Sequence, residues 1–447
     1  MHRIELARRP DLMSARDLDG AVGREVRVHG AVQRIRRLSW GAFVVLRRHD
    51  GLLQCVVAAG VEAADLDALR EGQYVRVTGE VRQASLKDAS ISPRNVEVHA
   101  SSIECLLDPV EPLRIDLTKK VLDLHIDTNL DNRPVSLRHP VERARLRISE
   151  GLGRAFREYH SAQGFTEIRT PKICFAGAEG GANIFKVQYF DREAFLAQSP
   201  QFYKQMGVAV FERVFEVGPV FRAEPHQTSR HINEYTSLDL EMGFIDSFHD
   251  VMAMEIGYLR AAMGLLASEY APELEMLEAD LPEVPAALPS VRLEEAHEIA
   301  GSMSGQDFSG EPDLDPEEER LLCEHSLREW GSEFLFVTHF PSSKRPFYTM
   351  DDPERPGETL SFDLLFRGLE ITTGGQRIHG YQEQAAKLMA FGLDPAGFES
   401  YLMAHRAGLP PHGGLAIGLE RLTARILRVE NIRLACMFPR DVKRLVP

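Results

Sequence analysis

Two clusters of arginine and glutamate are the residues in this chain best suited to hold a polyphosphate. The first is Phe221-Arg222-Ala223-Glu224, followed by Arg230-His231-Ile232. The second is Gly418-Leu419-Glu420-Arg421, about two hundred residues further on. An arginine guanidinium forms bidentate contacts with phosphate oxygens. A single arginine is more often a partner in a surface ion pair, but two such patterned clusters favour an anion-binding cleft.

The expected positions of these arginines support that interpretation. Arg222 follows the apolar run 214–221, which predicts a strand that ends at the cleft. Arg421 comes just after Gly418, where a predicted strand gives way to a helix. A helix N-terminus favours negative charge, so the helix and Arg421 can face one anion together. Glu224 can accept a hydrogen bond from an adenine amino group.

An acidic pair, Asp363 and Glu370, lies between the two clusters. In one continuous strand their odd spacing would place them on opposite faces. Gly368 favours a turn between them, and both carboxylates can then point into one site. Carboxylates that reach phosphates through Mg²⁺ fit this arrangement. The alternative, a solvated acidic pair, is disfavoured because the neighbouring residues are apolar.

Residues 24–99 predict a small β-barrel. Strands are expected at 24–37, 43–46, 52–57, 74–81 and 95–99, with an Asp50-Gly51 hairpin turn before the third and a helical piece around Leu66 and Leu69. Five strands with one helix are typical of an OB-type barrel. On strand count alone, a small all-β domain of other purpose is equally compatible.

The rest of the chain predicts a mixed α+β domain. Prolines punctuate 106–135, which is expected to be a linker. A helical pattern begins at Glu142 and ends at Gly164, where a strand follows. Asp315-Pro316 marks the capped start of a further helix.

Composition excludes several classes of protein. We find no stretch of roughly 20 apolar residues that could cross a membrane and no apolar core of a signal peptide. The five cysteines are scattered, which argues against a disulfide framework and a cysteine zinc site. A cytoplasmic protein is expected. The net charge of −15 argues against a generic nucleic-acid binder.

With Gln198-Ser199-Pro200-Gln201-Phe202-Tyr203-Lys204 and Phe438-Pro439-Arg440-Asp441, these motifs resemble those of class II aminoacyl-tRNA synthetases, and specifically the archaeal-type aspartyl-tRNA synthetases. The resemblance covers nearly the whole chain. It implies an α+β fold with an OB-fold anticodon-binding domain at 1–105, a hinge at 106–135 and a class II catalytic domain at 136–447, built on an antiparallel sheet flanked by helices. The region around Pro171 resembles the motif that forms a homodimer interface in this family.

The resemblance also implies roles for single residues. ATP would be bound by Arg222, Ala223, Glu224, Arg230, His231, Ile232, Glu370, Gly418, Leu419, Glu420 and Arg421. Mg²⁺ would be held by Asp363, Glu370 and Thr373, where several relatives have Ser at the last position. L-Aspartate would be bound by Glu179, Ser199, Gln201, Lys204, Arg222, Asp239, Thr373 and Arg377.

By this resemblance the enzyme forms aspartyl-adenylate and transfers the aspartyl group to tRNA, with Arg222 and Arg421 as catalytic residues. Catalysis then consists of positioning and electrostatic stabilisation. Lys204 and Arg377 would pair with the substrate's side-chain carboxylate. The neutral asparagine would leave both cations without a counter-charge, at a cost larger than that of a lost neutral contact. Asparaginyl-tRNA synthetases lack the lysine of this motif.

The choice of tRNA is expected to depend on the barrel. Gln33, Arg34, Arg36, Phe43 and Gln54 would form the anticodon-binding face, where aromatic stacking and cations suit single-stranded bases. Phe43 is equally compatible with barrel core. Gln33 falls where relatives specific for tRNA-Asp have Trp, and a lysine of those relatives would lie near 84–89, where this chain is shorter. We therefore hypothesise that both tRNA-Asp and tRNA-Asn are charged, with a separate amidotransferase converting Asp-tRNA-Asn. The alternative is strict specificity for tRNA-Asp through other residues.

Two functions of other classes stay open on the motifs alone. An asparagine synthetase of the synthetase-like kind shares the catalytic fold but lacks an anticodon barrel, so residues 24–99 argue against it. A non-catalytic RNA-binding paralogue would have lost the ATP site. The intact Arg222, Asp363, Glu370 and Arg421 argue against that.

Overall fold

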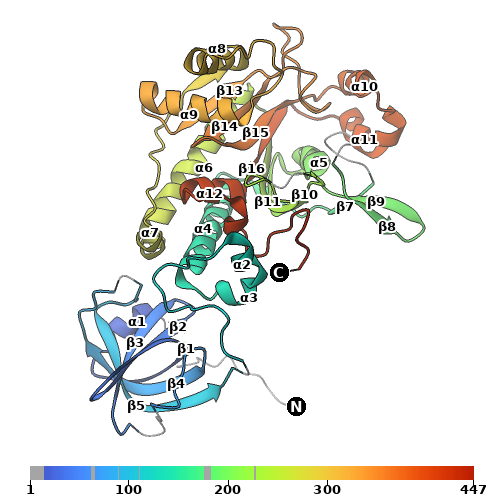
Figure 1. Cartoon of the computed structure of the whole chain (residues 1–447). Helices are drawn as coiled ribbons and strands as arrows, with labels where there is room; N and C mark the ends of the chain where they lie inside the picture. Colours follow the sequence, from blue (N-terminus) through green and yellow to red (C-terminus); the bar gives the residue numbers. More distant parts are fainter. Residues whose placement is uncertain are drawn as a thin grey trace. The chain divides into compact units, whose positions relative to one another are not determined.

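The structure is a computed structural model, and it describes residues 15–61, 66–88, 90–109, 111–175, 183–225 and 228–446. The chain divides into two compact units (Figure 1). The first contains the described residues up to Ala144, and the second contains most of the chain from Arg145 onward. The three-part division expected from the sequence, with breaks after 105 and 135, stays a prediction.

The first unit is a closed five-stranded barrel with strand order β1-β2-β3-β5-β4. Its strands are β1 (Glu25–Leu38), β2 (Gly41–Arg48), β3 (Gly51–Ala58), β4 (Tyr74–Gln83) and β5 (Val96–Leu107). Alternate apolar residues of these strands, such as Val26, Val28 and Val75, fill the barrel interior because successive side chains point to opposite faces. The short helices α1 (Ala15–Asp19), α2 (Ile126–Asp131) and α3 (Arg133–Ser136) belong to the same unit.

The barrel confirms the five predicted strands and the Asp50-Gly51 turn. The helix predicted around Leu66 and Leu69 is wrong for the described part, since residues 66–68 form a turn. Leu69 is buried and Leu66 packs against the barrel core, so their apolar spacing reflects burial of a loop.

The second unit is built on an eight-stranded sheet with order β12-β13-β14-β15-β16-β11-β10-β6. Its strands are β6 (Thr166–Glu167), β10 (Arg213–Phe221), β11 (Glu234–Gly243), β12 (Ser290–Arg292), β13 (Phe334–Thr338), β14 (Ser361–Phe366), β15 (Glu370–Arg377) and β16 (His412–Gly418). The six central strands pair antiparallel, and only the edge strands β12 and β6 pair parallel. A three-stranded sheet of order β7-β9-β8 comprises β7 (Ile173–Cys174), β8 (Lys186–Tyr189) and β9 (Arg192–Leu196).

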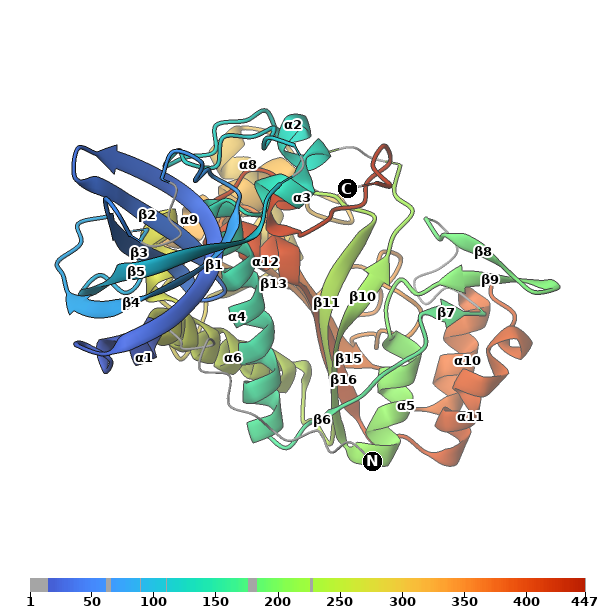
Figure 2. The ribbon, with the colours of Figure 1, turned by 90° about the horizontal axis from the view of Figure 1, so that it is seen from below.

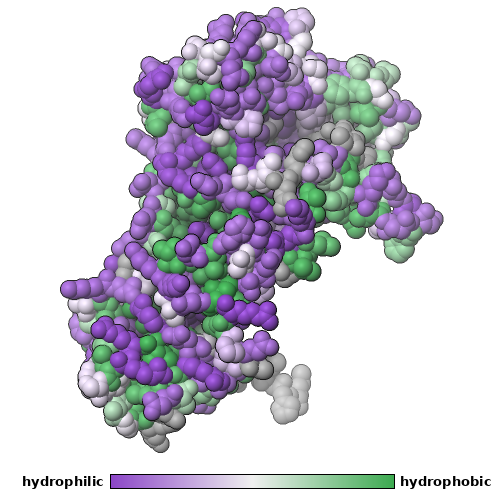
Figure 3. All heavy atoms as spheres, in the orientation of Figure 1, coloured by the Kyte–Doolittle hydropathy of each residue, from purple (hydrophilic) through white to green (hydrophobic). Residues whose placement is uncertain are grey.

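Helices cover this sheet. They are α4 (Pro140–Ala162), α5 (Gln201–Phe211), α6 (Phe248–Glu269), α7 (Ala271–Leu277), α8 (Leu293–Ser304), α9 (Pro316–Trp330), α10 (Tyr381–Ala390), α11 (Glu399–Ala407) and α12 (Leu419–Ile426), with short 3₁₀ helices at Pro395–Phe398 and Ile432–Ala435. Helices α4 and α6 lie side by side (Figure 2), joined where Tyr258 Oη donates to the carbonyl of Leu152 at 3.2 Å. Mostly hydrophilic side chains cover the face of α8 and α9 that Figure 3 presents.

Two local predictions in this unit are confirmed. The side chain of Asp315 caps the start of α9, and Glu318 completes the capping box. The turn expected near Gly368 joins β14 to β15, with Arg367 at φ 48° and Gly368 at φ 78°. Left-handed backbone of this kind suits glycine, which has no Cβ to clash.

One described helix, α6, is long and apolar enough to cross a membrane by length and composition, which the sequence analysis did not anticipate. Core helices of proteins outside membranes meet the same criterion. Tyr258, Leu259, Ala262 and Leu266 of α6 are fully buried, as expected for a helix that packs on the sheet.

Candidate active site

A cavity of about 350 Å³ lies over the central strands of the large sheet. Most of the residues predicted to bind ATP, aspartate or metal line it: Ser199, Gln201, Lys204, Arg222, Glu224, Arg230, His231, Ile232, Asp363, Glu370, Thr373, Arg377, Gly418, Glu420 and Arg421. They come from α5, β14, β15, β16, α12 and the loops that join the elements, and Tyr235 and Ser237 of β11 also line the cavity. Ala223, Leu419 and Asp239 are not among its lining residues, and Glu179 lies outside the described residues.

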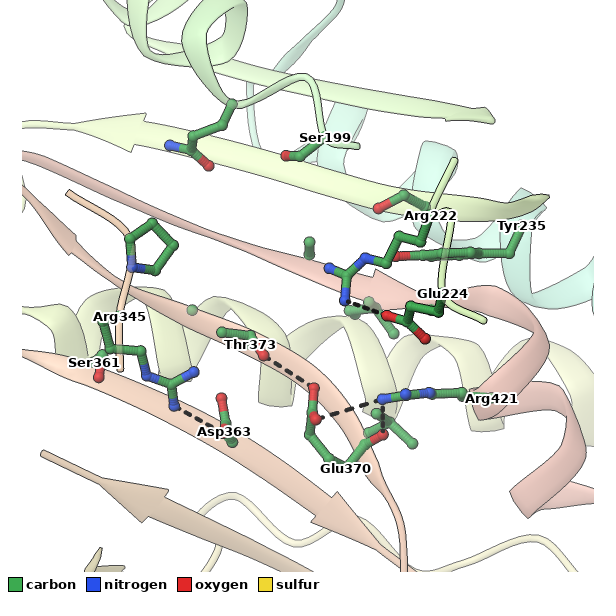
Figure 4. A pocket seen from close by; sticks show the side chains of 18 of the residues that line it. Ser199, Arg222, Glu224, Tyr235, Arg345, Ser361, Asp363, Glu370, Thr373 and Arg421 are labelled. Atoms are coloured by element: carbon green, nitrogen blue, oxygen red, sulfur yellow. Dashed lines mark hydrogen bonds and ion pairs between the residues drawn. The ribbon is translucent and has the colours of Figure 1, made fainter. Parts of the chain in front are cut away.

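Arg222 stands where β10 ends, as predicted. Its backbone is fixed by Asn233, whose side-chain amide donates to the carbonyls of Arg222 (2.7 Å) and Glu224 (3.0 Å). The guanidinium lies 3.9 Å from Glu224 Oε1 and over the ring of Tyr235 (Figure 4). The loop therefore holds Arg222 and Glu224 as a pair at one wall of the cavity.

Arg230 is held by a residue that the sequence analysis missed. Its guanidinium donates to Glu319 on α9, and Glu319 also accepts from the backbone N–H of Glu370 at 3.1 Å. Burial, with the nearby charge of Glu370, raises the pKa of Glu319 to about 7. Glu319 is one of three consecutive glutamates in the first turn of α9. Acidic residues are common at helix starts, so the sequence did not point to Glu319 as part of the site. In the same loop, His231 Nδ1 and Thr228 Oγ1 are 2.6 Å apart.

Arg421 lies in the first turn of α12, as predicted. It donates to the carbonyl of Glu370 at 3.0 Å and lies 3.4 Å from the carboxylate of the same residue. Glu420 accepts from the backbone N–H of Thr236 on β11 at 3.1 Å, and burial raises the pKa of Glu420 to about 7. Glu420 thus ties α12 to β11, in addition to lining the cavity.

The β14–β15 hairpin places Asp363 and Glu370 on the cavity floor (Figure 4). Asp363 pairs with Thr373 across the hairpin, and Thr373 Oγ1 donates to Glu370 Oε1 at 3.0 Å. Burial raises the pKa of Asp363 to about 7, and Glu370 adds to that shift. Burial would also raise the pKa of Glu370, but the charges of Arg421 and neighbouring arginines and the bond from Thr373 lower it below its ordinary value.

This donor set fits a magnesium ion. Two carboxylates and a hydroxyl supply oxygen ligands, and Mg²⁺ completes its shell with water and phosphate. Oδ1 of the buried Asp363 has no hydrogen-bond partner, so one of the two carboxylates has a free lone pair for a cation. Within the described part of the chain, no group of three or more His, Cys, Asp or Glu side chains is arranged to hold a metal by itself.

A buried charge cluster adjoins the predicted aspartate site. Lys204 Nζ lies 3.0 Å from Asp239 Oδ1 and 3.4 Å from Glu241 Oε2, and Arg377 Nε lies 3.1 Å from Glu241 Oε1. Burial opposes ionisation of Glu241, but Arg377 and Lys204 outweigh it and lower the pKa of this carboxyl. The two positive charges of Lys204 and Arg377 are therefore matched by the two negative charges of Asp239 and Glu241.

This cluster corrects the sequence-based account of specificity. We expected asparagine to leave Lys204 and Arg377 without counter-charges, but Asp239 and Glu241 already supply them. Lys204 also donates to the carbonyls of Leu240 (3.3 Å) and Leu415 (3.0 Å), which uses all three of its N–H donors. Asp239 was expected to face the substrate ammonium, whereas here it is buried against Lys204.

The loop between β13 and β14 brings in residues that the sequence analysis did not single out. Lys344, Arg345, Pro346, Tyr348 and Thr349 all line the cavity. Lys387 of α10 fastens this loop by donating to the carbonyl of Thr349 at 2.7 Å. Two adjacent cations before Pro-Phe-Tyr were a signal that could have drawn attention to the segment.

On the barrel, Arg34, Arg36, Phe43 and Gln54 line one groove, together with Ile35, Val45, Asp88 and Ile91. Arg34 pairs with Asp88 at 2.6 Å, and Gln54 donates to Glu97 at 2.8 Å. Gln33, which was predicted to share this face, is 5% exposed and is not among the residues that line the groove, so its part in anticodon binding stays a prediction. Gln33 donates to the carbonyl of Leu117 and accepts from Arg47, so it fixes the segment after the barrel.

Comparison with known proteins identifies the family. Residues 125–442 match the family of class II tRNA synthetases (D, K and N), and residues 26–106 match the OB-fold nucleic acid binding domain. The aspartate–tRNA(Asp/Asn) ligase of Thermus thermophilus is 45% identical, over 97% of this chain and 99% of that relative. The enzyme of the same name from Aeropyrum pernix is 44% identical, over 96% of this chain and 97% of that relative. The aspartate–tRNA(Asp) ligase of Pyrococcus abyssi is 37% identical, over 95% of this chain and 97% of that relative.

Solved structures agree with this relationship. The asparaginyl-tRNA synthetase of Pyrococcus horikoshii in complex with asparaginyl-adenylate has a TM-score of 0.86 and 30% identity, covering 96% of this chain and 97% of that one. A putative aspartyl-tRNA synthetase of Leishmania major has a TM-score of 0.85 and 28% identity, covering 97% and 94%. The chain therefore belongs to the class II tRNA synthetases of the D, K and N family and, within it, to the aspartate–tRNA ligases, as its motifs predicted.

Proposed function

We propose that this protein activates L-aspartate with ATP and transfers the aspartyl group to both tRNA-Asp and tRNA-Asn. The observation that carries the proposal is one cavity that brings Arg222, Arg230 and Arg421 together with the Lys204–Arg377 cluster. Anticodon recognition is assigned to residues 1–105, a hinge to 106–135 and catalysis to 136–447.

In the first step, the α-carboxylate of aspartate attacks the α-phosphate of ATP. A carboxylate–phosphorus bond forms, and the bond to pyrophosphate breaks. Arg222 offsets charge on the α-phosphate, and Arg230 and Arg421 hold the leaving phosphates. Because Glu319 and Glu370 already orient the last two arginines, little reorganisation is needed when charge develops.

Asp363, Glu370 and Thr373 are the residues that would hold Mg²⁺, which when bound supplies positive charge beside the phosphates. In the second step, a hydroxyl of the tRNA's terminal ribose takes the aspartyl group from the adenylate, and AMP leaves. No side chain has to act as a covalent nucleophile.

Selection of aspartate is assigned chiefly to Arg377. Arg377 donates through Nε to Glu241, and one of its NH₂ groups donates to the carbonyl of Gly414 at 2.9 Å and to Gln201 Oε1 at 3.5 Å. A guanidinium has five N–H donors, so capacity remains for a substrate carboxylate. Lys204 is fully engaged and reaches the substrate only if it releases a present partner. In this proposal Lys204 neutralises Asp239 and Glu241. Arg377 can then bind the substrate carboxylate, which is the third carboxylate of the cluster.

The use of both tRNAs is supported by the barrel and by the relatives. By the resemblance described above, Gln33 falls where strictly specific relatives have Trp. The relatives from Thermus thermophilus and Aeropyrum pernix, which are 45% and 44% identical over most of this chain, carry the designation Asp/Asn. Charging tRNA-Asn with aspartate produces a mismatched product, so a separate amidotransferase would have to convert it to Asn-tRNA-Asn.

Aminoacylation of purified transcripts tests the proposal. We expect labelled aspartate on both tRNA-Asp and tRNA-Asn, with pyrophosphate exchange that depends on aspartate and not on asparagine. Charging of tRNA-Asp alone would establish the strictly specific alternative. Aspartate-dependent exchange without charging of either tRNA would refute the ligase function.

The proposal includes a homodimer that works in the cytoplasm. The segment after Pro171 exposes large apolar side chains, with Ile173 at 50% and Phe175 at 59% exposure. Exposed apolar clusters of this kind favour a protein interface. Light scattering on the purified protein should give about twice the chain mass of 50.2 kDa. A monomer at micromolar concentration would contradict this part of the proposal.

A further inference from the structure

Arg345 is a cavity-lining cation without a role in the proposed chemistry. It lies in the loop before β14, and its side chain is 11% exposed. Its guanidinium lies over the ring of Phe340 at 3.8 Å, and one NH₂ group is 2.8 Å from Asp363 Oδ2 (Figure 4). The guanidinium of Arg345 therefore pairs with one carboxylate oxygen of Asp363, a predicted metal ligand.

This ion pair leaves bonding capacity unused on both sides. Nε of Arg345 and Oδ1 of Asp363 are buried and have no hydrogen-bond partner, while the NH₂ nitrogen of Arg345 that faces Asp363 Oδ2 is held there as an ion pair. Buried polar atoms in native proteins nearly always have partners. The unfilled Nε–H of Arg345 has capacity for an acceptor such as a phosphate oxygen, and the unfilled oxygen of Asp363 has capacity for a cation or a donor.

Two arginines of the sequence clusters, Arg230 and Arg421, differ in this respect. Arg230 donates to Glu319, and Arg421 donates to the carbonyl of Glu370 at 3.0 Å. Arg345 instead neutralises Asp363 while facing the same cavity. A divalent cation and Arg345 therefore compete for one carboxylate, and binding of the cation weakens the attraction that holds the guanidinium there.

We propose that Arg345 is a further nucleotide-binding residue, which exchanges Asp363 for a phosphate oxygen when a divalent cation binds at Asp363. The inference rests on the proposed function, because the phosphate is that of the ATP bound in this cavity. Phe340 and the adjoining Pro346 keep the guanidinium near the cavity during the exchange, so that only its partner changes.

The matched control lies next to it in the chain. Lys344 also lines the cavity and carries the same charge, but it pairs at 3.2 Å with Asp313, a residue that is not a predicted metal ligand. Both Lys344 and Asp313 are about half exposed. Lys344→Gln therefore removes one positive charge from the same loop without freeing Asp363.

The test compares Arg345→Gln, Arg345→Lys and Lys344→Gln in the full-length protein. Binding of Mn²⁺ alone, followed by electron paramagnetic resonance without nucleotide, should tighten at least threefold in Arg345→Gln, since the competing cation is gone. The KM for ATP in aspartate-dependent pyrophosphate exchange should rise about tenfold or more, the effect of one lost charge-assisted hydrogen bond. Arg345→Lys should fall between, and Lys344→Gln should change either quantity less than twofold.

Three results would overturn the proposal, provided that circular dichroism shows a folded variant. One is an unchanged KM for ATP in Arg345→Gln, and another is Mn²⁺ affinity equal to or weaker than that of the wild type. The third is a rise in KM for aspartate alone, which would assign Arg345 to the amino acid. A wild-type enzyme without aspartate-dependent exchange would refute the proposed function instead, while the Mn²⁺ measurement would still report on the Arg345–Asp363 pair.

Discussion

At the scale of single residues, the active site is a set of charges that were paired before any substrate arrives. Lys204, Arg230, Arg345 and Arg421 each face a carboxylate of the protein itself. Buried charges are tolerated only when they are paired, so each predicted substrate-binding cation needed a partner elsewhere in the chain. The effect of a mutation at such a cation therefore includes the unpaired carboxylate that it leaves behind.

Lys204→Met should both inactivate and destabilise the protein. The variant leaves Asp239 and Glu241 with too little positive charge in a buried cluster, which costs about 3 kcal/mol or more of the free energy of unfolding. Aspartate-dependent pyrophosphate exchange should be lost as well. Denaturant unfolding and the exchange assay measure the two effects.

The matched control is Lys186→Met, which makes the same change at an exposed ion pair with Glu193. This variant should alter stability by about 0.5 kcal/mol or less. Equal stability of Lys204→Met and the wild type would show that the cluster does not depend on Lys204 for its charge balance.

His160 should make the protein lose stability as the pH falls. It is fully buried among Phe156, Phe165 and Phe215, and burial lowers its pKa from 6.5 to about 4. Between these two pH values His160 is protonated in the unfolded chain but stays neutral in the folded chain. Stability contributed by this site is thus complete above pH 6.5 and is lost as the pH drops toward 4, by roughly 3 kcal/mol in total.

His160→Phe should remove this dependence because the ring no longer titrates. When the pH is lowered from 7.5 to 4.5, the melting temperature of the wild type should fall further than that of the variant. A constant difference over that range would contradict neutral burial of His160.

At the scale of elements, close approach of strands determines where the charges lie. Gly414 of β16 is opposite Glu241 of β11. A Cβ added at Gly414 would lie 2.1 Å from Glu241 Oε2 and 2.3 Å from the carbonyl of Leu240. Only a residue without a side chain lets Glu241 reach Lys204 and Arg377.

Gly414→Ala should therefore displace Glu241 and the β11 backbone. We expect about 2–3 kcal/mol of destabilisation from overpacking and a large loss of aspartate activation, measured by unfolding and pyrophosphate exchange. Gly264→Ala on α6 is the control, since nothing lies within 4 Å of the added Cβ. That variant should gain about 0.5–1 kcal/mol from helix propensity and keep its activity. If the two variants behaved alike, the close approach would have no functional consequence.

At the scale of the whole molecule, the proposed function places adenylate chemistry and anticodon recognition in different units. The cavity lies entirely in the unit from Arg145 onward, and the groove with Phe43 lies entirely in the barrel. Changes in the groove should affect only reactions that include tRNA.

Phe43→Ala tests this separation. Loss of one base–aromatic stack should lower kcat/KM for tRNA charging about fivefold to a hundredfold, which corresponds to roughly 1–3 kcal/mol. Pyrophosphate exchange should not change. Leu107→Ala, at an exposed position on β5, serves as the control and should leave charging intact. An equal loss of pyrophosphate exchange in Phe43→Ala would show that Phe43 serves the stability of the whole chain.

The sequence by itself determined the features that depend on local pattern. The barrel strands follow from alternation, the turn at Gly368 from the need for left-handed backbone, and the family from motifs whose residues are close along the chain, such as Arg222 with Glu224. The placement of Arg421 at a helix start is also local.

Only the tertiary structure decided which charges meet. The ion-paired residues Arg230 and Glu319 are far apart along the chain, and so are Arg377 and Glu241. Arg345 is likewise far along the chain from Arg222, although both line the cavity. Ion pairs form between whatever side chains the folded sheet brings together, and residue spacing along the chain carries no information about such distances. The same reason explains why the sequence left Lys204 and Arg377 without counter-charges: Asp239 and Glu241, which neutralise them, lie on β11, whereas Lys204 lies on α5 and Arg377 on β15.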